Sequence, residues 1–304
     1  MNPRQELDVK LARISKVYDV DLLLALKTSP VISSRKFTVD TLPLPLFQIS
    51  TRMGSPFTTA LERDVKSILE SIWFVDKYIA ESKANQVLEL GAGSNGGSLY
   101  LAWKYPKVQY FRVASFEGKL VHELKKYRGV PNYHSIHGTF DKLEMFEKDA
   151  FEVLFSVESL SLAEDRGKVL DAAYRILKEK SYFIVVDGYL GKSPGALTRE
   201  ELIGRHLVGR GKALKEFETY DDFLQLVHDH KYNIVFEADV SEQALPALKR
   251  YERQAELFFK VPVYSKLVSV LFSSDFAYNM ISNYLMPSAV KMGMAQYKVT
   301  VLRK

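Results

Sequence analysis

The feature that most constrains the fold of this chain is an alternation of short apolar stretches with helical stretches between Gln86 and Tyr189. The apolar stretches have the length and composition of β-strands: QVLELGAG, VQYFRVA, YHSIHG, FEVLFSV and SYFIVVDGY. Segments such as DRGKVLDAAYRILKEK, which lie between them, have helical periodicity. Because strands that alternate with helices pair in parallel, we predict an α/β fold whose sheet is covered by helices on both faces.

Further segments flank this alternating region. Residues 1–85 are mainly helical in pattern and are predicted to form an N-terminal cap. Residues 86–242 form the predicted core, 243–294 a helical insertion, and 295–304 a final strand of the core. The longest uncharged run, Phe276–Val290, contains a proline and is too short to span a bilayer.

Composition narrows the classes of protein. A chain of 304 residues with 47% hydrophobic and 26% charged residues can bury a core of its own. It contains no cysteine, which excludes disulfides, thiolate metal sites and a cysteine nucleophile. The first residues, MNPRQELDVKLARISKVYD, are charged throughout and contain no signal peptide, so we expect a cytoplasmic protein.

The net charge of +5 raises the question of nucleic-acid binding, but the lysines and arginines are scattered rather than gathered with aromatic residues. We therefore expect no nucleic-acid partner. The densest basic run, Arg199–Glu218, is interpreted as a solvated helical face, with an anionic headgroup or phosphorylated substrate as the alternative. His134, His137, His228 and His230 come in pairs without a third ligand, so no metal site is expected.

The sequence VLELGAGSNGG follows the first strand and places Gly91, Gly93 and Gly96 in a G-x-G-x-x-G pattern. Closely spaced glycines let the backbone turn sharply and approach a ligand, and the next helix offers its N-terminal N–H groups. Such a pattern by itself suggests a dinucleotide site, and a nicotinamide enzyme stays an alternative. Glu89, two residues before the first glycine, favours instead a ligand with a cationic group.

At these residues the sequence resembles the class I S-adenosylmethionine-dependent methyltransferases. VLELGAGSNGGS is similar to their first motif, and VLDAAYRILKEKSYFIVVDGY to their helix and fifth strand. SVESL and the segments YNIVFEADVSEQALPALKRYERQAELFF and YLMPSAVKMGMAQYKVTVLRK resemble the subgroup of sterol C-methyltransferase-like proteins (methyltransferase type 11). The likeness extends over residues 85–304 and implies a Rossmann-like methyltransferase sheet with S-adenosyl-L-methionine as its cofactor.

The resemblance also implies a set of cofactor-binding residues, with Glu89 beside the methionine end and the glycine turn beneath it. These residues are Glu89, Gly91, Ala92, Gly93, Ser115, Phe116, Thr139, Phe140 and Ser156. Two positions with expected cofactor contacts depart from the family. Ala114 replaces the acid that binds the ribose hydroxyls, with Glu117 as a substitute if the loop rearranges, and Thr139 replaces the acceptor for the adenine amino group.

For catalysis the resemblance indicates Glu158, at the end of the fourth strand, as an acid beside the methyl acceptor. A purely structural role for Glu158 is the alternative, and Leu162 stands near the place of a family histidine. The aromatic residues of the last third favour a small hydrophobic acceptor such as a sterol, isoprenoid or other lipid, although most such residues form cores. An inactive methyltransferase-like partner or ligand-binding subunit is the second hypothesis. Peripheral membrane contact and a homo- or hetero-oligomer are compatible with the sequence.

Overall fold

The structure is a computed structural model in which residues 2–18, 65–91, 96–114, 130–192, 194–211, 218–260 and 274–304 are described. The chain divides into two compact units, each assembled from segments far apart in the sequence. The sheet unit comprises Phe57–Gly188, Asp221–Val240 and Tyr297–Lys304, and the helical unit comprises Met1–Pro56, Tyr189–Tyr220 and Ser241–Gln296. The four-part domain division made from the sequence stays a prediction, because a compact unit is not yet an independently folding domain.

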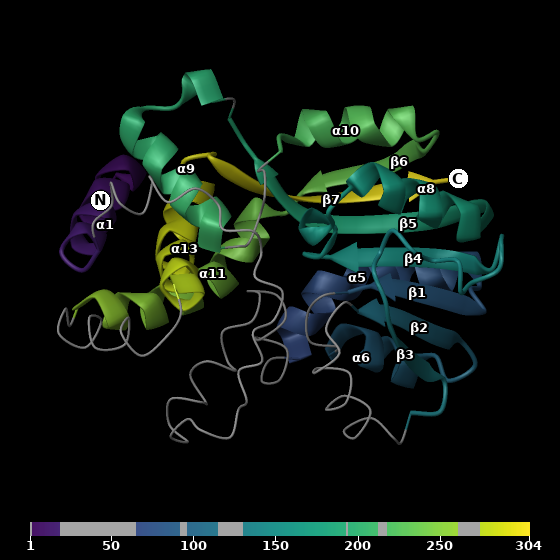
Figure 1. Cartoon of the computed structure of the whole chain (residues 1–304). Coiled ribbons are helices and arrows are strands. Elements are labelled where there is room, and N and C mark those ends of the chain that lie inside the picture. The colour runs from purple at the N-terminus through teal and green to yellow at the C-terminus, as the bar shows by residue number, and fades with distance from the viewer. Residues whose placement is uncertain are drawn as a thin grey trace. The chain divides into compact units, whose positions relative to one another are not determined.

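A seven-stranded sheet in the order β3-β2-β1-β4-β5-β7-β6 confirms the predicted α/β fold (Figure 1). The chain pairs β1 in parallel with β2 and β4, β2 with β3, and β4 with β5, whereas β6 and β7 are antiparallel. The strands are β1 (Gln86–Leu90), β2 (Gln109–Ala114), β3 (Tyr133–His137), β4 (Phe151–Val157), β5 (Leu177–Leu190), β6 (Asn233–Asp239) and β7 (Ala295–Arg303).

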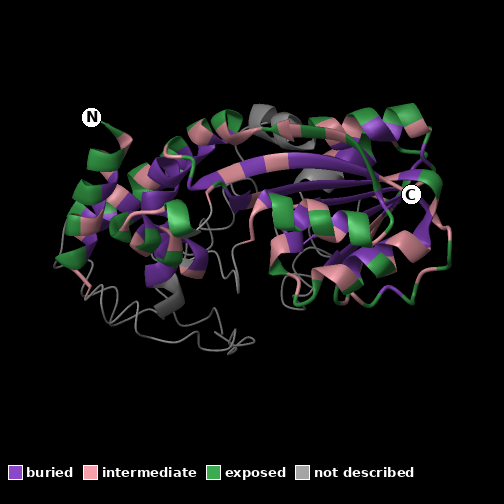
Figure 2. Ribbon diagram, turned by 90° about the horizontal axis from the view of Figure 1, so that it is seen from above, coloured by how far each residue is buried: buried purple, intermediate pink, exposed green. Residues whose placement is uncertain are grey.

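Helices cover both faces of this sheet. Helix α5 (Val65–Ser82) and helix α6 (Gly96–Lys104) pack on one face, where their buried side chains join one core cluster with residues of five strands. Helix α8 (Arg166–Ile176) lies on the other face: Tyr232 contacts the ring of Phe183 on β5 and donates a hydrogen bond to the Leu170 carbonyl. Buried residues accordingly run along the strands in Figure 2. Helix α10 spans Tyr220–Asp229, and short 3-10 turns span Leu160–Leu162 and Pro194–Ala196.

The helix predicted as DRGKVLDAAYRILKEK is shorter in the structure. Helix α8 ends at Ile176, and Leu177 has an extended backbone (ψ 138°) that begins β5. Backbone pairing outside the segment overrides its local helical preference, because Leu177 pairs with Phe151 and Lys180 donates its N–H to the Lys304 carbonyl. The segment LVHELKKYRG (residues 120–129), whose sequence also predicts a helix, lies outside the described residues.

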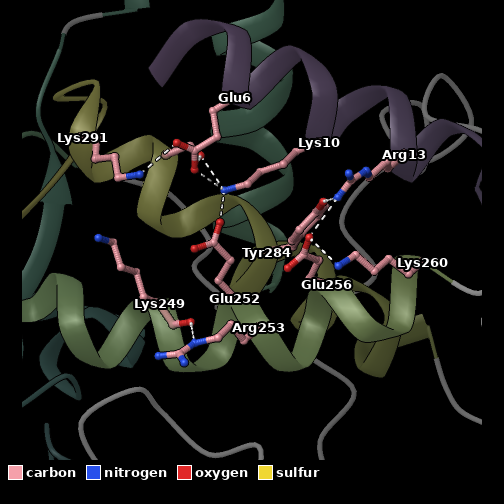
Figure 3. A network of polar contacts seen from close by, with 11 residues as sticks. Glu6, Lys10, Arg13, Lys249, Glu252, Arg253, Glu256, Lys260, Tyr284 and Lys291 are labelled. Carbon is pink, nitrogen blue, oxygen red and sulfur yellow. Dashed lines mark hydrogen bonds and ion pairs between the residues drawn. The ribbon is translucent and has the colours of Figure 1, made fainter. Parts of the chain in front are cut away.

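The helical unit contains α1 (Pro3–Ser15), α9 (Arg199–Gly211), α11 (Ser241–Lys260) and α13 (Ser274–Lys291), with α13 in contact with the other three. Figure 3 shows how charges fix α1 to α11 and α13. Lys10 is only 4% exposed and forms ion pairs with Glu6 and Glu252, and Glu6 also pairs with Lys291 at 2.9 Å. Arg13 donates to the Tyr284 hydroxyl at 2.8 Å.

The aromatic residues of the late helices belong largely to the core of the helical unit. Phe258, Phe259, Tyr278 and Tyr284 are all buried, and the rings of Phe259 and Tyr284 stack at 5.1 Å. Their packing follows the ordinary role of such residues. Among the described helices, none has the length and apolar character that a membrane span requires.

Candidate functional site

The candidate site lies at the edge of the sheet where the parallel strands β1, β2, β4 and β5 have their carboxyl ends. In open α/β sheets, ligands bind at this edge, where successive connections leave in opposite directions. The order β2-β1-β4 places such a reversal beside β1, since the chain proceeds from β1 to one side and later returns to the other. Residues after β1 and β4 are therefore the first to consider.

Glu89 and Arg112 form an ion pair across two neighbouring strands at this edge. They are directly paired in the register of β1 and β2, and the Arg112 Nε atom lies 3.4 Å from Glu89 Oε2. The Arg112 side chain is 1% exposed and that of Glu89 is 12% exposed. Arg112 Nη2 also donates to the Gly91 carbonyl oxygen at 3.3 Å. One buried cation thus contacts both the acid and the first glycine of the predicted motif.

Gly91 lies where a Cβ atom would displace a neighbouring side chain. A Cβ atom at this residue would lie 2.7 Å from Glu89 Oε1 and 3.0 Å from Arg112 Nε, closer than carbon approaches such atoms in proteins. The Gly91 N–H donates to the Val113 carbonyl at 3.1 Å, which fixes the start of the turn to β2. Ala92 and Gly93, the next two predicted cofactor residues, lie outside the described residues.

The ends of β2 and β3 carry the two departures from the family pattern. Ala114 is 5% exposed, and its carbonyl accepts a hydrogen bond from Gly138 at 3.1 Å. Thr139 is exposed, whereas Phe140 beside it is buried. Ser115 and Phe116 lie outside the described residues, as does Glu117. The cofactor contacts assigned to Thr139 and Phe140 stay predictions.

Ser156 and Glu158 bring the end of β4 next to β1. Ser156 is fully buried, and its Oγ atom has no hydrogen-bond partner among the described residues. Glu158 has a left-handed backbone conformation (φ 47°), and its N–H donates to the Val186 carbonyl at 2.8 Å. Residues other than glycine rarely adopt this backbone conformation, and those that do are frequent at functional sites.

Two residues of this region were given no role from the sequence, namely Asp187 and Tyr297. Burial raises the pKa of Asp187, although its carboxylate accepts backbone N–H groups from Ser161 at 2.8 Å and Gly188 at 2.9 Å. Burial, the charges of Glu158 and Asp187, and a hydrogen bond to Glu158 raise the pKa of the Tyr297 hydroxyl. Asp187 ends the apolar run FIVVD, which is the pattern that could have marked it.

The structure therefore gathers four predicted residues at one edge of the sheet, where the adjacent strands β1 and β4 end. Glu89 and Ser156 lie on these strands, and Gly91 and Glu158 directly follow them. Arg112 joins them from β2, a position that sequence reasoning did not single out. In the part of the chain that the structure describes, no three His, Asp or Glu side chains are grouped as metal ligands. The polar groups at this edge are the carboxylates of Glu89 and Glu158, the buried Ser156 hydroxyl and the backbone turn at Gly91. Such groups suit an organic ligand that carries polar groups of its own.

Known proteins resemble this chain in part of its sequence and in its fold. Residues 88–185 match the family model described as "Methyltransferase domain". A curated relative, the glycine/sarcosine/dimethylglycine N-methyltransferase of Actinopolyspora halophila, is 29% identical over 108 residues, 35% of this chain and 19% of the relative. The chain thus spans about a fifth of that relative's length.

Two solved structures share the fold over most of the chain. One is a putative sarcosine dimethylglycine methyltransferase from Galdieria sulphuraria (TM-score 0.61, 15% identity, 83% of this chain and 92% of that one). The other is geranyl diphosphate C-methyltransferase from Streptomyces coelicolor A3(2) (TM-score 0.54, 12% identity, 82% and 90%). The family match and the sheet order together show that residues 88–185 are similar to a methyltransferase domain.

Proposed function

We propose that this protein transfers the methyl group of S-adenosylmethionine to a small acceptor molecule. The observation that carries the proposal is the turn at Gly91, held between Glu89 and Arg112 at the edge of a sheet with the 3-2-1-4-5-7-6 order. The match of residues 88–185 to the methyltransferase domain supports it. S-adenosyl-L-homocysteine, the demethylated form of the cofactor, is bound in one of the structures with the same fold.

The residues present fit such a cofactor. Gly91 has no side chain to separate its backbone from a ligand, and a Cβ atom there would displace the Glu89 carboxylate. The buried Ser156 hydroxyl is available to a polar ligand group, and a buried polar atom without a partner is costly. Glu89 supplies a carboxylate for an ammonium group, with Arg112 holding one of its oxygens. These residues would hold the methionine end of the molecule.

When bound, the cofactor supplies a methyl carbon activated by a sulfonium. The acceptor would form its new bond to that carbon as the carbon–sulfur bond breaks, and the sulfur would keep the electron pair. The protein would orient the acceptor against the methyl group and remove the acceptor's proton. Glu158 is the residue we assign to the second task, because its carboxylate can accept that proton or stabilise a developing positive charge.

A small apolar acceptor, such as an isoprenoid, sterol or other lipid, is our first choice. The likeness of the sequence to sterol C-methyltransferase-like proteins and of the fold to a geranyl diphosphate C-methyltransferase supports it. A small amine is the second choice, supported by the identity with the glycine/sarcosine/dimethylglycine enzyme. The two choices differ in chemistry, since a carbon acceptor loses a proton from carbon, whereas an amine loses it from nitrogen.

A binding subunit without activity is the competing function, and Ala114 is the observation that favours it. Loss of a charge-assisted hydrogen bond to a polar ligand costs about 1.5–3 kcal/mol, or roughly ten- to a hundredfold in affinity. The replacement of the ribose-binding acid by a buried alanine removes one such bond. The exposed Thr139 provides a hydroxyl where the family has its usual acceptor for the adenine amino group.

The test is calorimetric titration with S-adenosylmethionine and S-adenosylhomocysteine, followed by incubation with methyl-labelled cofactor. The acceptors offered are geranyl diphosphate, a total lipid extract, glycine and sarcosine. Label in the isoprenoid or lipid product supports our first choice, and label in methylated glycine or sarcosine replaces it with the second. Binding of neither cofactor form would refute the proposed function, and binding without labelled product would favour the inactive subunit.

A further inference from the structure

Arg112 is an unusual residue for its place in the sheet. It lies on β2 between the buried residues Tyr110 and Ala114 and is among the largest fully buried side chains described. An apolar residue would complete this strand without the loss of hydration that a buried guanidinium suffers. Its two contacts, with the Glu89 carboxylate and the Gly91 carbonyl, both lie in the motif that follows β1.

The two oxygens of the Glu89 carboxylate have different neighbours. Its Oε2 atom is the one paired with Arg112, at 3.4 Å from Nε. Its Oε1 atom is the one nearest to Gly91, where a Cβ would approach it to 2.7 Å. Arg112 Nε holds Glu89 Oε2, and Arg112 Nη2 holds the Gly91 carbonyl. The Glu89 carboxylate and the turn are therefore fixed relative to each other.

We propose that Arg112 is a positioning residue of the cofactor site, which acts through Glu89 and the Gly91 carbonyl to recognise the amino-acid end of S-adenosylmethionine. The inference rests on the proposed function and adds a residue to it. The Arg112 side chain is 1% exposed, which is too little for it to contact the cofactor directly. Its effect must therefore pass through the two groups that it holds.

Two consequences of removing Arg112 oppose each other. The lost positive charge would favour a cationic ligand by Coulomb attraction to Glu89. The lost ion pair would leave a largely buried carboxylate without its cation, so that the carboxylate either takes up a proton or turns toward solvent. The second effect dominates, because a displaced or protonated Glu89 offers no oriented charge at all.

The experiment compares two ligands that differ only at the amino-acid end, S-adenosylhomocysteine and 5′-methylthioadenosine. In Arg112→Met, we expect the Kd of S-adenosylhomocysteine to rise about tenfold or more, while the Kd of methylthioadenosine changes less than about twofold. Arg112→Lys keeps the charge but not the two-pronged geometry, and is expected to fall between Arg112→Met and the native protein.

A double-mutant cycle with Glu89→Gln isolates the route. If Arg112 acts in part through Glu89, adding Arg112→Met to Glu89→Gln weakens S-adenosylhomocysteine binding by a smaller factor than Arg112→Met does in the native protein. The remaining loss measures the route through the Gly91 carbonyl. This double variant and Arg112→Lys also replace Arg112→Met if that protein does not fold. The matched control is Arg175→Met, which removes an arginine that donates to the Leu143 and Phe146 carbonyls of the same unit.

The outcomes separate the inference from the proposed function. Equal losses for the two ligands, losses that multiply in the double variant, or a loss no larger than in Arg175→Met would overturn the role of Arg112. A native protein that binds neither S-adenosylmethionine nor S-adenosylhomocysteine refutes the proposed function instead. Selective loss of the ligand with the amino-acid end supports both.

Discussion

The hydroxyl of Tyr297, on the last strand of the chain, hydrogen-bonds to the side chain of Glu158 at the end of β4. Tyr297 is 2% exposed, and its ring lies 3.8 Å from the point where a Cβ on Gly188 would stand. The bond therefore forms in a buried setting, where a hydrogen bond to a carboxylate has a strong effect on its orientation. Glu158 is thereby fixed from a strand that is remote in the sequence.

The first prediction concerns the charge of Glu158. Glu158→Gln keeps the shape of the side chain and removes its capacity to accept a proton. With the acceptor identified by the labelling assay, we expect turnover to fall about a hundredfold or more while S-adenosylhomocysteine affinity stays nearly unchanged. Unchanged turnover in a folded variant would make Glu158 a structural acid.

The second prediction separates orientation from stability. Tyr297→Phe removes the hydroxyl that holds Glu158, and we expect turnover to fall about tenfold with a stability loss of about 1 kcal/mol. Tyr232→Phe is the control, because it removes another buried hydroxyl that bonds at 3.0 Å to a backbone carbonyl. Steady-state kinetics and urea unfolding should show similar stability losses in both variants but slower turnover in Tyr297→Phe alone.

The third prediction tests the space at Gly91. In Gly91→Ala the new methyl group would stand 2.7 Å from Glu89 Oε1, so the carboxylate or the turn must move. We expect S-adenosylhomocysteine affinity to fall about tenfold or more by calorimetry, in line with loss of a charge-assisted contact. Gly195→Ala, where no atom lies within 4 Å of the new methyl group, should bind as the native protein does. Native affinity in Gly91→Ala would remove this turn from the site.

The fourth prediction restores an acid to the end of β2. Ala114→Asp should tighten cofactor binding by up to about 2 kcal/mol through a ribose contact. Because position 114 is buried, the same change should lower the free energy of unfolding without ligand by about 1–3 kcal/mol. Ala114→Asn, similar in size and uncharged, should give a smaller gain. Calorimetry that finds no gain for Asp would indicate that other groups already bind the ribose hydroxyls.

The fifth prediction concerns the stability of the helical unit at low pH. Burial tends to raise the pKa of Glu6, but hydrogen bonds from Lys10 and Lys291 outweigh it and lower the pKa from 4.5 to about 2. A carboxyl group with a lowered pKa in the folded state stabilises that state above its unfolded pKa, and loses the effect as pH falls through its folded pKa. We therefore expect the stabilisation due to Glu6 to decline between about pH 4.5 and pH 2.

Glu6→Gln isolates this contribution. Urea unfolding should show the native protein more stable than Glu6→Gln near neutral pH, with the difference shrinking as pH falls toward 2. Glu179→Gln is the control, since the Glu179 side chain is 79% exposed and lies 3.9 Å from Lys304. A difference that stays constant across this pH range would contradict the network of Figure 3 as the source.

The sequence by itself determined the sheet and the place of the turn. Apolar strands such as QVLEL and FEVLFSV are largely buried and carry their preference locally, so their existence could be predicted from residue type alone. FEVLFSV has the predicted bounds, whereas the first strand ends at Leu90, before the glycines of the predicted segment QVLELGAG. The turn at Gly91 was equally predictable, because a Cβ atom at this residue would stand 2.7 Å from Glu89 Oε1.

Only the tertiary structure decided which side chains meet. Arg112 has no pattern of its own in QYFRVA, and its role comes from the register that pairs it with Glu89. Tyr297 reaches Glu158 because β7 enters the sheet beside β5, a pairing between segments far apart in the chain. The end of α8 at Ile176 likewise follows from pairing of Leu177 with Phe151. Local propensity is a property of a few neighbouring residues, whereas strand pairing depends on the free energy of the whole sheet, and the latter prevails.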